Sequence, residues 1–182
     1  MDKNSPIEKN MSSHHRMKER ELILVVDDDS AIRLLMREVL QQAGLTIIDA
    51  SNGSEAVELF EQHQPDLMLL DVKMPKMDGY EVCNRIRQFN TGSETPIIMI
   101  TGLEDGDSIE KAYQAGATDF ITKPVVWTIL SHRVRYLLRA AKAFKALRQN
   151  ELRLIQAQQV ARLGNWEWDI ASDEFHWSDE MY

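Results

Sequence analysis

Apolar runs and helical patterns alternate along the chain between Glu21 and Leu138. A short apolar run ended by turn residues is typical of a buried strand, whereas apolar residues spaced three or four apart are typical of a helix. We predict strands at Leu22–Val26, Leu45–Asp49, Leu67–Leu70, Ile97–Ile100 and Thr118–Thr122, and helices from Ile32 to a stop at Gly44, at Ser54–His63, at Tyr80–Phe89, at Asp107–Ala115 and from Val125 onward. Strands that alternate with helices of about ten residues indicate βαβ units. The predicted fold class is therefore α/β, a (βα)5 doubly wound parallel sheet with helices on both faces.

The pattern differs at both ends of the chain. Residues 1–19 are polar, contain lysine and show no period, so we predict a disordered tail. Residues 20–140 contain the α/β domain, and residues 141–162 continue its last helix as a linker. Residues 163–182 contain three of the four tryptophans, and they begin with a segment, Leu163–Ile170, in which apolar and polar residues alternate as in a strand. A second strand-like segment follows at Glu174–Trp177. Two short strands do not form a stable domain alone, so we expect this segment to be the opening of a further domain.

The linker helix carries a stripe of modest apolar character. Its positions are Tyr136, Ala140, Ala143, Leu147, Asn150, Leu154, Ala157 and Ala161, which step alternately by four and three residues. This heptad spacing favours an intermolecular coiled coil, in which Asn150 would specify register and a two-stranded state. A single amphipathic helix that lies on its own domain is the alternative.

Composition limits the partners and the compartment. The 182 residues carry a net charge of -8, which argues against nonspecific binding of nucleic acid or of an anionic membrane. Cys83 is the single cysteine, so an intrachain disulfide is excluded and a reducing compartment fits. The sequence contains neither an apolar run of about 18 residues nor the apolar stretch of a signal peptide. We expect a cytoplasmic protein.

Acidic, hydroxyl and amino side chains follow the predicted strands. Asp27 and Asp28 come after the first strand, Asp71 after the third, Thr101 after the fourth and Lys123 after the fifth. The carboxyl ends of parallel strands meet at one rim, where open α/β folds bind ligands. Carboxylate oxygens suit Mg²⁺, and a lysine and a hydroxyl can contact a phosphoryl group. The pattern predicts a site in which Asp71 is the nucleophile of phosphoryl transfer.

Each of these residues also has an ordinary explanation. The Asp27-Asp28-Asp29-Ser30 run can cap a helix, a role that we expect of Asp29 or Ser30. Asp71 can be a turn residue, Thr101 can be only a strand-end or capping residue, and Lys123 can be a solvated loop charge. The joint pattern decides between the readings, since all of these residues lie at the carboxyl ends of strands.

The segments Leu24–Ser30, Leu69–Gly79, Ile100–Gly102 and Lys123-Pro124 resemble the receiver domain of bacterial response regulators. The resemblance covers about residues 21–140. It implies a flavodoxin-like fold with strand order 2-1-3-4-5. It also implies that Asp71 accepts a phosphoryl group from a histidine kinase or a phosphotransfer protein. Asp28, Asp71 and the backbone carbonyl of Lys73 would bind Mg²⁺ directly, and Asp27 would act mainly through water.

The same resemblance implies a conformational switch and a dimer. Thr101 would move toward the phosphoryl group, and Phe120, in the position of the family's switch aromatic, would fill the space behind it. Phe120 lacks a hydroxyl group, so packing alone would drive this movement. The fourth helix, fifth strand and fifth helix would form a homodimer together with the C-terminal helix.

Two further resemblances concern the output. Ala157–Tyr182 resembles the entry to a PAS sensory domain, through Gly164-Asn165-Trp166-Glu167-Trp168-Asp169. His132–Ala140 resembles the linker helix of receiver–PAS proteins with diguanylate cyclase and phosphodiesterase modules, which implies control of cyclic di-GMP. We expect this chain to be a signalling module and not an enzyme, with any output enzyme outside it.

Three alternatives to this switch remain. A haloacid-dehalogenase type of enzyme also uses an Asp nucleophile and Mg²⁺, but it needs a second Asp where this chain has Lys73. A degenerate receiver that serves only as a dimerisation scaffold is opposed by the complete set of acidic, hydroxyl and amino residues. The receiver part of a hybrid histidine kinase would use the same site.

Overall fold

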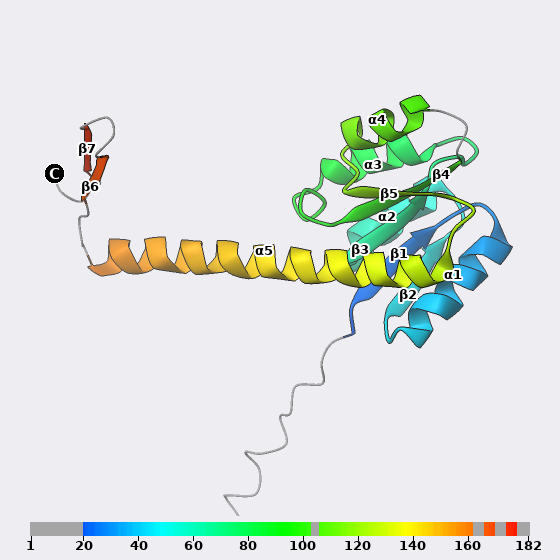
Figure 1. Cartoon of the computed structure of the whole chain (residues 1–182), viewed down its shortest axis with the longest axis horizontal. Coiled ribbons are helices and arrows are strands. Elements are labelled where there is room, and N and C mark those ends of the chain that lie inside the picture. The colour runs from blue at the N-terminus through cyan, green and yellow to red at the C-terminus, as the bar shows by residue number, and fades with distance from the viewer. Residues whose placement is uncertain (1–19, 103–105, 162–165, 170–173, 178–182) are drawn as a thin grey trace, which may run out of the picture. The chain divides into compact units, whose positions relative to one another are not determined.

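Five parallel strands form the centre of the computed structural model (Figure 1). They are β1 (Leu22–Val26), β2 (Thr46–Ala50), β3 (Leu67–Asp71), β4 (Ile97–Gly102) and β5 (Asp119–Lys123). Their order in the sheet is β2-β1-β3-β4-β5, and every neighbouring pair is parallel. The predicted fold class and strand order are confirmed. The structure describes residues 20–102, 106–161, 166–169 and 174–177, so the predicted disordered tail lies outside the described residues.

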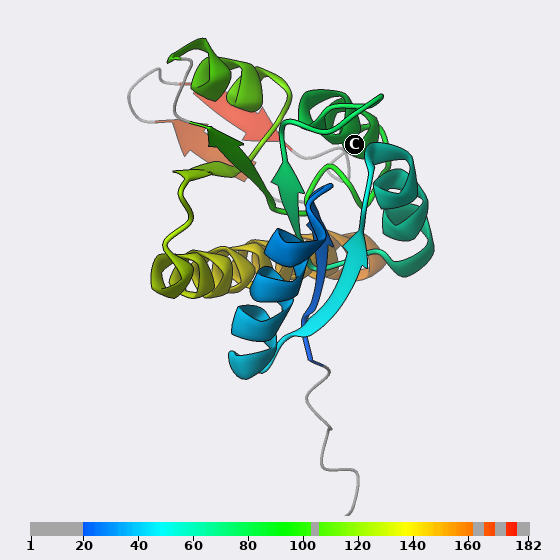
Figure 2. The same cartoon turned by 90° about the vertical axis from the view of Figure 1, so that its right-hand side faces the viewer.

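The helices lie on both faces of this sheet. They are α1 (Ser30–Gln42), α2 (Gly53–His63), α3 (Gly79–Arg87), α4 (Gly106–Gln114) and α5 (Trp127–Ala161). In Figure 1, α1 and the start of α5 lie on one side of the sheet, and α2 and α3 lie on the other; Figure 2 shows the same arrangement after a quarter turn. The chain therefore forms two helical layers around a central sheet, as a doubly wound fold requires.

The sheet forms because its central strands, β1, β3 and β4, are apolar and buried on both faces. All five residues of β3 are buried. Successive side chains of a strand point to opposite faces. Met68 and Leu70 accordingly join one core cluster with Phe60 of α2 and Ile86 of α3. Each buried side chain of this size contributes about 1.5–3 kcal/mol relative to an exposed one.

Side chains cap three helices beside the strand ends. The carboxylate of Asp29 accepts hydrogen bonds from the backbone N–H groups of Ala31 and Ile32 and begins α1. Asn52 caps α2 and Asp78 caps α3 in the same way. Gly44 has a φ of 85°, a conformation that glycine adopts without strain, and the chain turns there after α1 as predicted. The capping role expected of Asp29 or Ser30 thus belongs to Asp29.

The chain divides into two units, Met1–Arg135 and Tyr136–Tyr182. The division falls within α5. In the second unit, β6 (Trp166–Asp169) pairs antiparallel with β7 (Glu174–Trp177), so both predicted strand segments are confirmed. Within the described ranges, no helix has the length and apolar character needed to cross a membrane.

Candidate functional site

Three carboxylates and one ammonium group meet at the carboxyl ends of β1, β3 and β5. One carboxylate oxygen from each of Asp27, Asp28 and Asp71 lies within 4.8 Å of the others. The Lys123 Nζ atom lies 2.7 Å from Asp71 Oδ1 and 3.2 Å from Asp27 Oδ2. These residues are far apart in sequence, and the parallel register of the sheet brings them together. We call Asp27, Asp28, Asp71 and Lys123 the acidic site.

Burial and charge differ among the members of the acidic site. Asp27 is fully buried and Asp71 is 2% exposed, whereas Asp28 is exposed. Burial raises the pKa of Asp71, and the negative charges of Asp27 and Asp28 raise it further, against the lowering effect of Lys123. Burial alone would lower the pKa of Lys123, but its hydrogen bond to Asp71 and the charges of Asp71 and Asp27 outweigh burial and raise it. Lys123 therefore stays protonated between two carboxylates.

The donor set of the acidic site fits a divalent cation. When ionised, its three carboxylates and one ammonium group carry an excess of two negative charges. Like charges at this separation repel one another unless a cation lies between them. Mg²⁺ prefers hard oxygen ligands and keeps several waters, which suits a cluster with one exposed member. Asp27, Asp28 and Asp71 are therefore the residues that would hold Mg²⁺.

The two predicted switch residues lie in neighbouring strands, Thr101 in β4 and Phe120 in β5. Thr101 is buried in β4, and its hydroxyl group donates a hydrogen bond to the Gly102 carbonyl oxygen at 3.3 Å. The residue before it, Ile100, pairs with Asp71 in the sheet register. Phe120 in β5 is half-buried and packs edge-on against Tyr113 of α4, with ring centroids 5.9 Å apart. The roles of Thr101 and Phe120 as a switch stay predictions.

The loop after Asp71 packs tightly against the start of α3. The Gly79 N–H group donates to the Val72 carbonyl oxygen at 2.9 Å. A Cβ atom on Gly79 would lie 2.8 Å from Val72 Cα and would also collide with the Asp71 carbonyl oxygen. Only glycine therefore fits where α3 approaches the backbone of Asp71. Lys73 lies in this loop with an exposed side chain, and the role of its carbonyl as a ligand stays a prediction.

Arg33 and Asp49 adjoin the acidic site, and neither residue was predicted from the sequence. Arg33 donates a hydrogen bond to the backbone oxygen of Asp27 at 2.7 Å and forms an ion pair with Asp49 at 3.5 Å. A sequence signal for Arg33 exists. The N-terminal end of a helix disfavours positive charge, so an arginine close to the start of α1 points to a specific partner.

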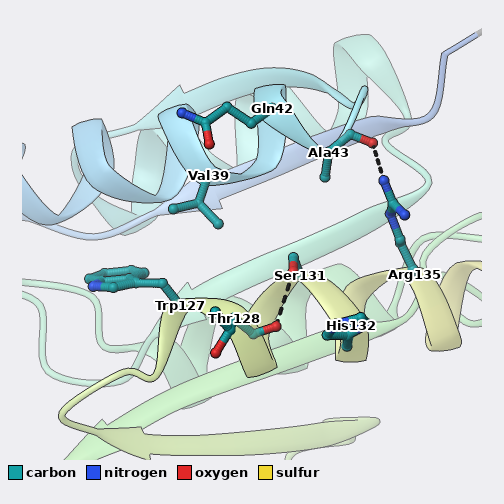
Figure 3. Close-up of a pocket in the computed structure, with 8 residues that line it drawn as sticks. All are labelled: Val39, Gln42, Ala43, Trp127, Thr128, Ser131, His132 and Arg135. Atoms are coloured by element: carbon teal, nitrogen blue, oxygen red, sulfur yellow. Dashed lines mark hydrogen bonds between the residues drawn. The ribbon is translucent and has the colours of Figure 1, made fainter.

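A second concavity lies near the opposite end of α1 (Figure 3). It encloses about 360 Å³ between the last turn of α1 and the start of α5, and Trp127, His132 and Arg135 contribute to its lining. Arg135 crosses it and donates a hydrogen bond to the Ala43 carbonyl oxygen at 2.7 Å. A helix of 13 residues is about 20 Å long, so most of α1 separates this pocket, which begins at Val39, from the acidic site. None of the residues that line it is acidic, and it offers no cation site.

Comparison with known proteins identifies the family. The model of the response regulator receiver domain matches residues 23–135. The chain belongs to this family. A response regulator from Chloroflexus aurantiacus J-10-fl has a crystal structure that matches with a TM-score of 0.64 and 33% identity, over 66% of this chain and 99% of that one. The receiver fold and the two-component class of the chain are thereby established.

Two curated relatives extend the comparison. A Guillardia theta protein named as a transcriptional regulator, ycf27, is 41% identical over 120 residues, which is 66% of this chain and 46% of that protein. A Cyanidium caldarium protein with the same name is 33% identical over 172 residues, which is 94% of this chain and 64% of that protein. The chain thus covers less than two thirds of either relative's length.

Proposed function

We propose that this chain is a phosphoacceptor switch in which Asp71 receives a phosphoryl group. The observation that carries the proposal is the position of the Lys123 Nζ atom, 2.7 Å from Asp71 and 3.2 Å from Asp27, with the exposed Asp28 beside them. An ammonium group at this place offsets the charge of the nucleophile and of an incoming phosphoryl group.

The reaction forms one P–O bond and breaks one bond of the donor. An Asp71 oxygen atom attacks phosphorus, and the donor leaves with the electron pair of its bond to phosphorus. The donor that we propose is the phosphohistidine of a histidine kinase or phosphotransfer protein, whose imidazole nitrogen is the leaving atom. When bound at Asp27, Asp28 and Asp71, Mg²⁺ would neutralise phosphoryl oxygens. We include the Lys73 carbonyl as a further ligand.

Lys123 and Thr101 would recognise the product. An aspartyl phosphate adds about two negative charges and three acceptor oxygens. Lys123 already touches the acceptor carboxylate, and the Thr101 hydroxyl lies on the neighbouring strand. A move of Thr101 toward the phosphoryl group would open space for the ring of Phe120, which packs against α4. This links the acidic site to the surface of α4, β5 and α5.

We propose that α5 transmits this change as part of a homodimer. Several apolar side chains of its extension are exposed in one chain, including Leu147 and Leu154 on the predicted seam. An exposed apolar stripe at heptad spacing favours pairing of two helices. Domain boundaries at residues 20–140, 141–162 and 163–182 belong to the same proposal, in which the linker leads to an output module.

The output of the whole protein is a separate proposal. The two curated relatives are named as transcriptional regulators, which favours an output on gene expression. If the output module binds DNA, the prediction that nucleic acid is not a partner applies to this chain and not to the output module. The family match ends at residue 135, before the PAS-like segment, so cyclic di-GMP control has only the sequence resemblance as support.

Acetyl phosphate with Mg²⁺ tests the switch directly. We expect the intact mass to increase by one phosphoryl group, because acetate is a good leaving group and Asp71 is the nucleophile. D71N should show no increase, and K123A should show a slower one. Failure of the wild-type chain to gain this mass with either acetyl phosphate or phosphoramidate would favour the degenerate scaffold.

A further inference from the structure

Arg33 joins the acidic site to the neighbouring strand β2. Its guanidinium group donates to the Asp27 backbone oxygen at 2.7 Å, and its Nε atom lies 3.5 Å from Asp49 Oδ2. The side chain is 17% exposed. A guanidinium group presents donors in a planar fork, so one side chain can hold two acceptors in a fixed relation. Arg33 thereby connects a backbone atom of the acidic site to a side chain of β2.

The backbone oxygen that Arg33 holds belongs to the peptide between Asp27 and Asp28. The last bond of this segment to β2 runs from Asp27 N–H to the Ala50 oxygen at 3.4 Å. The Asp27 carboxylate has its own contacts, with the Asp29 N–H group at 2.9 Å and with Lys123. The exposed Asp28 carboxylate takes its direction from the peptide that precedes it. Rotation of that peptide would move Asp28 away from Asp27 and Asp71.

Asp49 gives the guanidinium group a fixed anchor. It lies in β2, where it pairs with Val25 of β1 in the sheet register. Its second oxygen atom forms an ion pair with Arg37, one turn further along α1. Loss of Arg33 would therefore leave Asp49 with Arg37 as a partner. This makes substitution of Arg33 a specific test of the bond to Asp27.

We propose that Arg33 is a positioning residue for cation binding: it fixes the peptide between Asp27 and Asp28 and so holds their two carboxylates toward a common divalent cation. The inference rests on the proposed function of the acidic site as a Mg²⁺ site. It assigns no contact between Arg33 and the cation or the phosphoryl group. Residues that orient metal ligands in this way typically change metal affinity 10- to 100-fold when they are replaced.

Electrostatics and positioning predict opposite effects of R33M. Removal of a positive charge beside an acidic cluster would strengthen cation binding by Coulomb attraction alone. Loss of the bond to Asp27 would weaken it, because the carboxylates would no longer be preorganised. We expect R33M to bind Mg²⁺ about 10-fold more weakly than the wild-type chain. R33K keeps the charge but not the fork, so we expect an intermediate loss.

R37M is the matched control. It removes a positive charge from the same helix, and this charge also belongs to an ion partner of Asp49. The hydrogen bond to the Asp27 oxygen comes from Arg33 and is kept in this variant. We expect its Mg²⁺ affinity to stay within about twofold of the wild type. Calorimetric titration with Mg²⁺ measures all four proteins. In Mg²⁺-free protein, the amide nitrogen resonance of Asp28 should shift in R33M and stay nearly unchanged in R37M.

The outcomes separate this inference from the proposed function. Equal or tighter Mg²⁺ binding by R33M overturns the inference, and R33K decides it in the same way if R33M does not fold. Absence of Mg²⁺ binding by the wild-type chain overturns the inference and the proposed metal site together. A wild-type chain that binds Mg²⁺ tightly but takes no phosphoryl group from acetyl phosphate would overturn the phosphoacceptor function alone.

Discussion

At the scale of single residues, the acidic site carries an electrostatic cost. Burial and two neighbouring carboxylates raise the pKa of Asp71. For an acid whose folded-state pKa is raised, ionisation disfavours the folded state, so stability falls as the pH rises from the unfolded pKa through the folded one. At neutral pH the Asp71 charge therefore opposes folding. Functional sites commonly retain such costs.

D71N should relieve this cost. Without divalent cations at neutral pH, we expect D71N to raise the free energy of unfolding by about 0.5–2 kcal/mol, because it removes a buried negative charge while Asp27 keeps Lys123 paired. Urea denaturation in a chelator measures the change. Added Mg²⁺ should stabilise the wild-type chain more than D71N. A less stable D71N would show that the ion pair with Lys123 outweighs burial.

Gly79 is the second residue whose substitution has a clear outcome. A methyl group there meets Val72 Cα at 2.8 Å and the backbone of Asp71. Backbone cannot move aside as a flexible side chain can, so we expect G79A to lose about 1–3 kcal/mol of stability and to slow phosphorylation of Asp71. G102A is the control, since a Cβ atom there meets nothing within 4 Å. Equal urea midpoints for the two variants would contradict the steric argument.

At the scale of elements, Glu55 makes the stability of the start of α2 depend on pH. Its carboxylate accepts hydrogen bonds from the Ser51 N–H group at 2.8 Å and from the Ser51 hydroxyl at 2.7 Å, while Asn52 caps the Glu55 N–H group at 3.0 Å. This reciprocal arrangement satisfies donors at the helix start. The backbone bond from Ser51 is the main cause that lowers the pKa of Glu55, and the hydroxyl bond adds to it.

E55Q should make the free energy of unfolding depend less on pH in the acid range. A lowered folded-state pKa means that the contribution of Glu55 is present above its unfolded pKa, about 4.3, and disappears as the pH falls through the folded value. We expect E55Q to cost about 0.5–1 kcal/mol at pH 7 and progressively less below pH 4. Thermal unfolding between pH 3 and 7 checks this. E58Q is the control, because Glu58 is exposed on the same helix.

The elements themselves were largely predictable because local pattern and tertiary burial agree. The apolar run Leu67–Leu70 is buried on both faces, as a central parallel strand must be, and Gly44 follows α1 as expected. The acidic site was predictable for a topological reason. Parallel strands place their carboxyl ends together, so Asp27, Asp71 and Lys123 converge without any local signal of contact.

Contacts of long side chains were not predictable in the same way. Arg87 donates to the backbone oxygen atoms of Gly92, Thr95 and Gly116, and so connects the loops before β4 and β5. Arg33 reaches from α1 to the end of β1 and to β2. Each sequence position shows only an arginine on a helix. Which acceptors it meets depends on how the helix packs, and the apolar pattern does not contain that information.

At the scale of the whole molecule, α5 carries a long row of exposed apolar side chains. Leu147 is 60% exposed and Leu154 is 63% exposed. Because each is already partly buried, full burial by a second helix would contribute about 1–2 kcal/mol per side chain. The seam also includes alanines, which bury little apolar area, and Asn150, which specifies register at a cost in the stability of the dimer. We therefore expect a weak dimer whose stability depends on the receiver domain as well as on α5.

The double variant L147E/L154E should weaken this dimer. Two carboxylates per chain on the seam would meet their counterparts across the interface, and like charges at a buried contact are strongly unfavourable. L152E is the control, since Leu152 is 53% exposed on the same helix but lies off the seam. Sedimentation equilibrium, with and without beryllofluoride as a phosphoryl mimic, measures the association. We expect beryllofluoride to strengthen association of the wild-type chain and of L152E. L147E/L154E should associate about 10-fold or more weakly than the wild-type chain, a difference of at least about 1.4 kcal/mol. Equal association of the two variants would show that the heptad seam is not the interface.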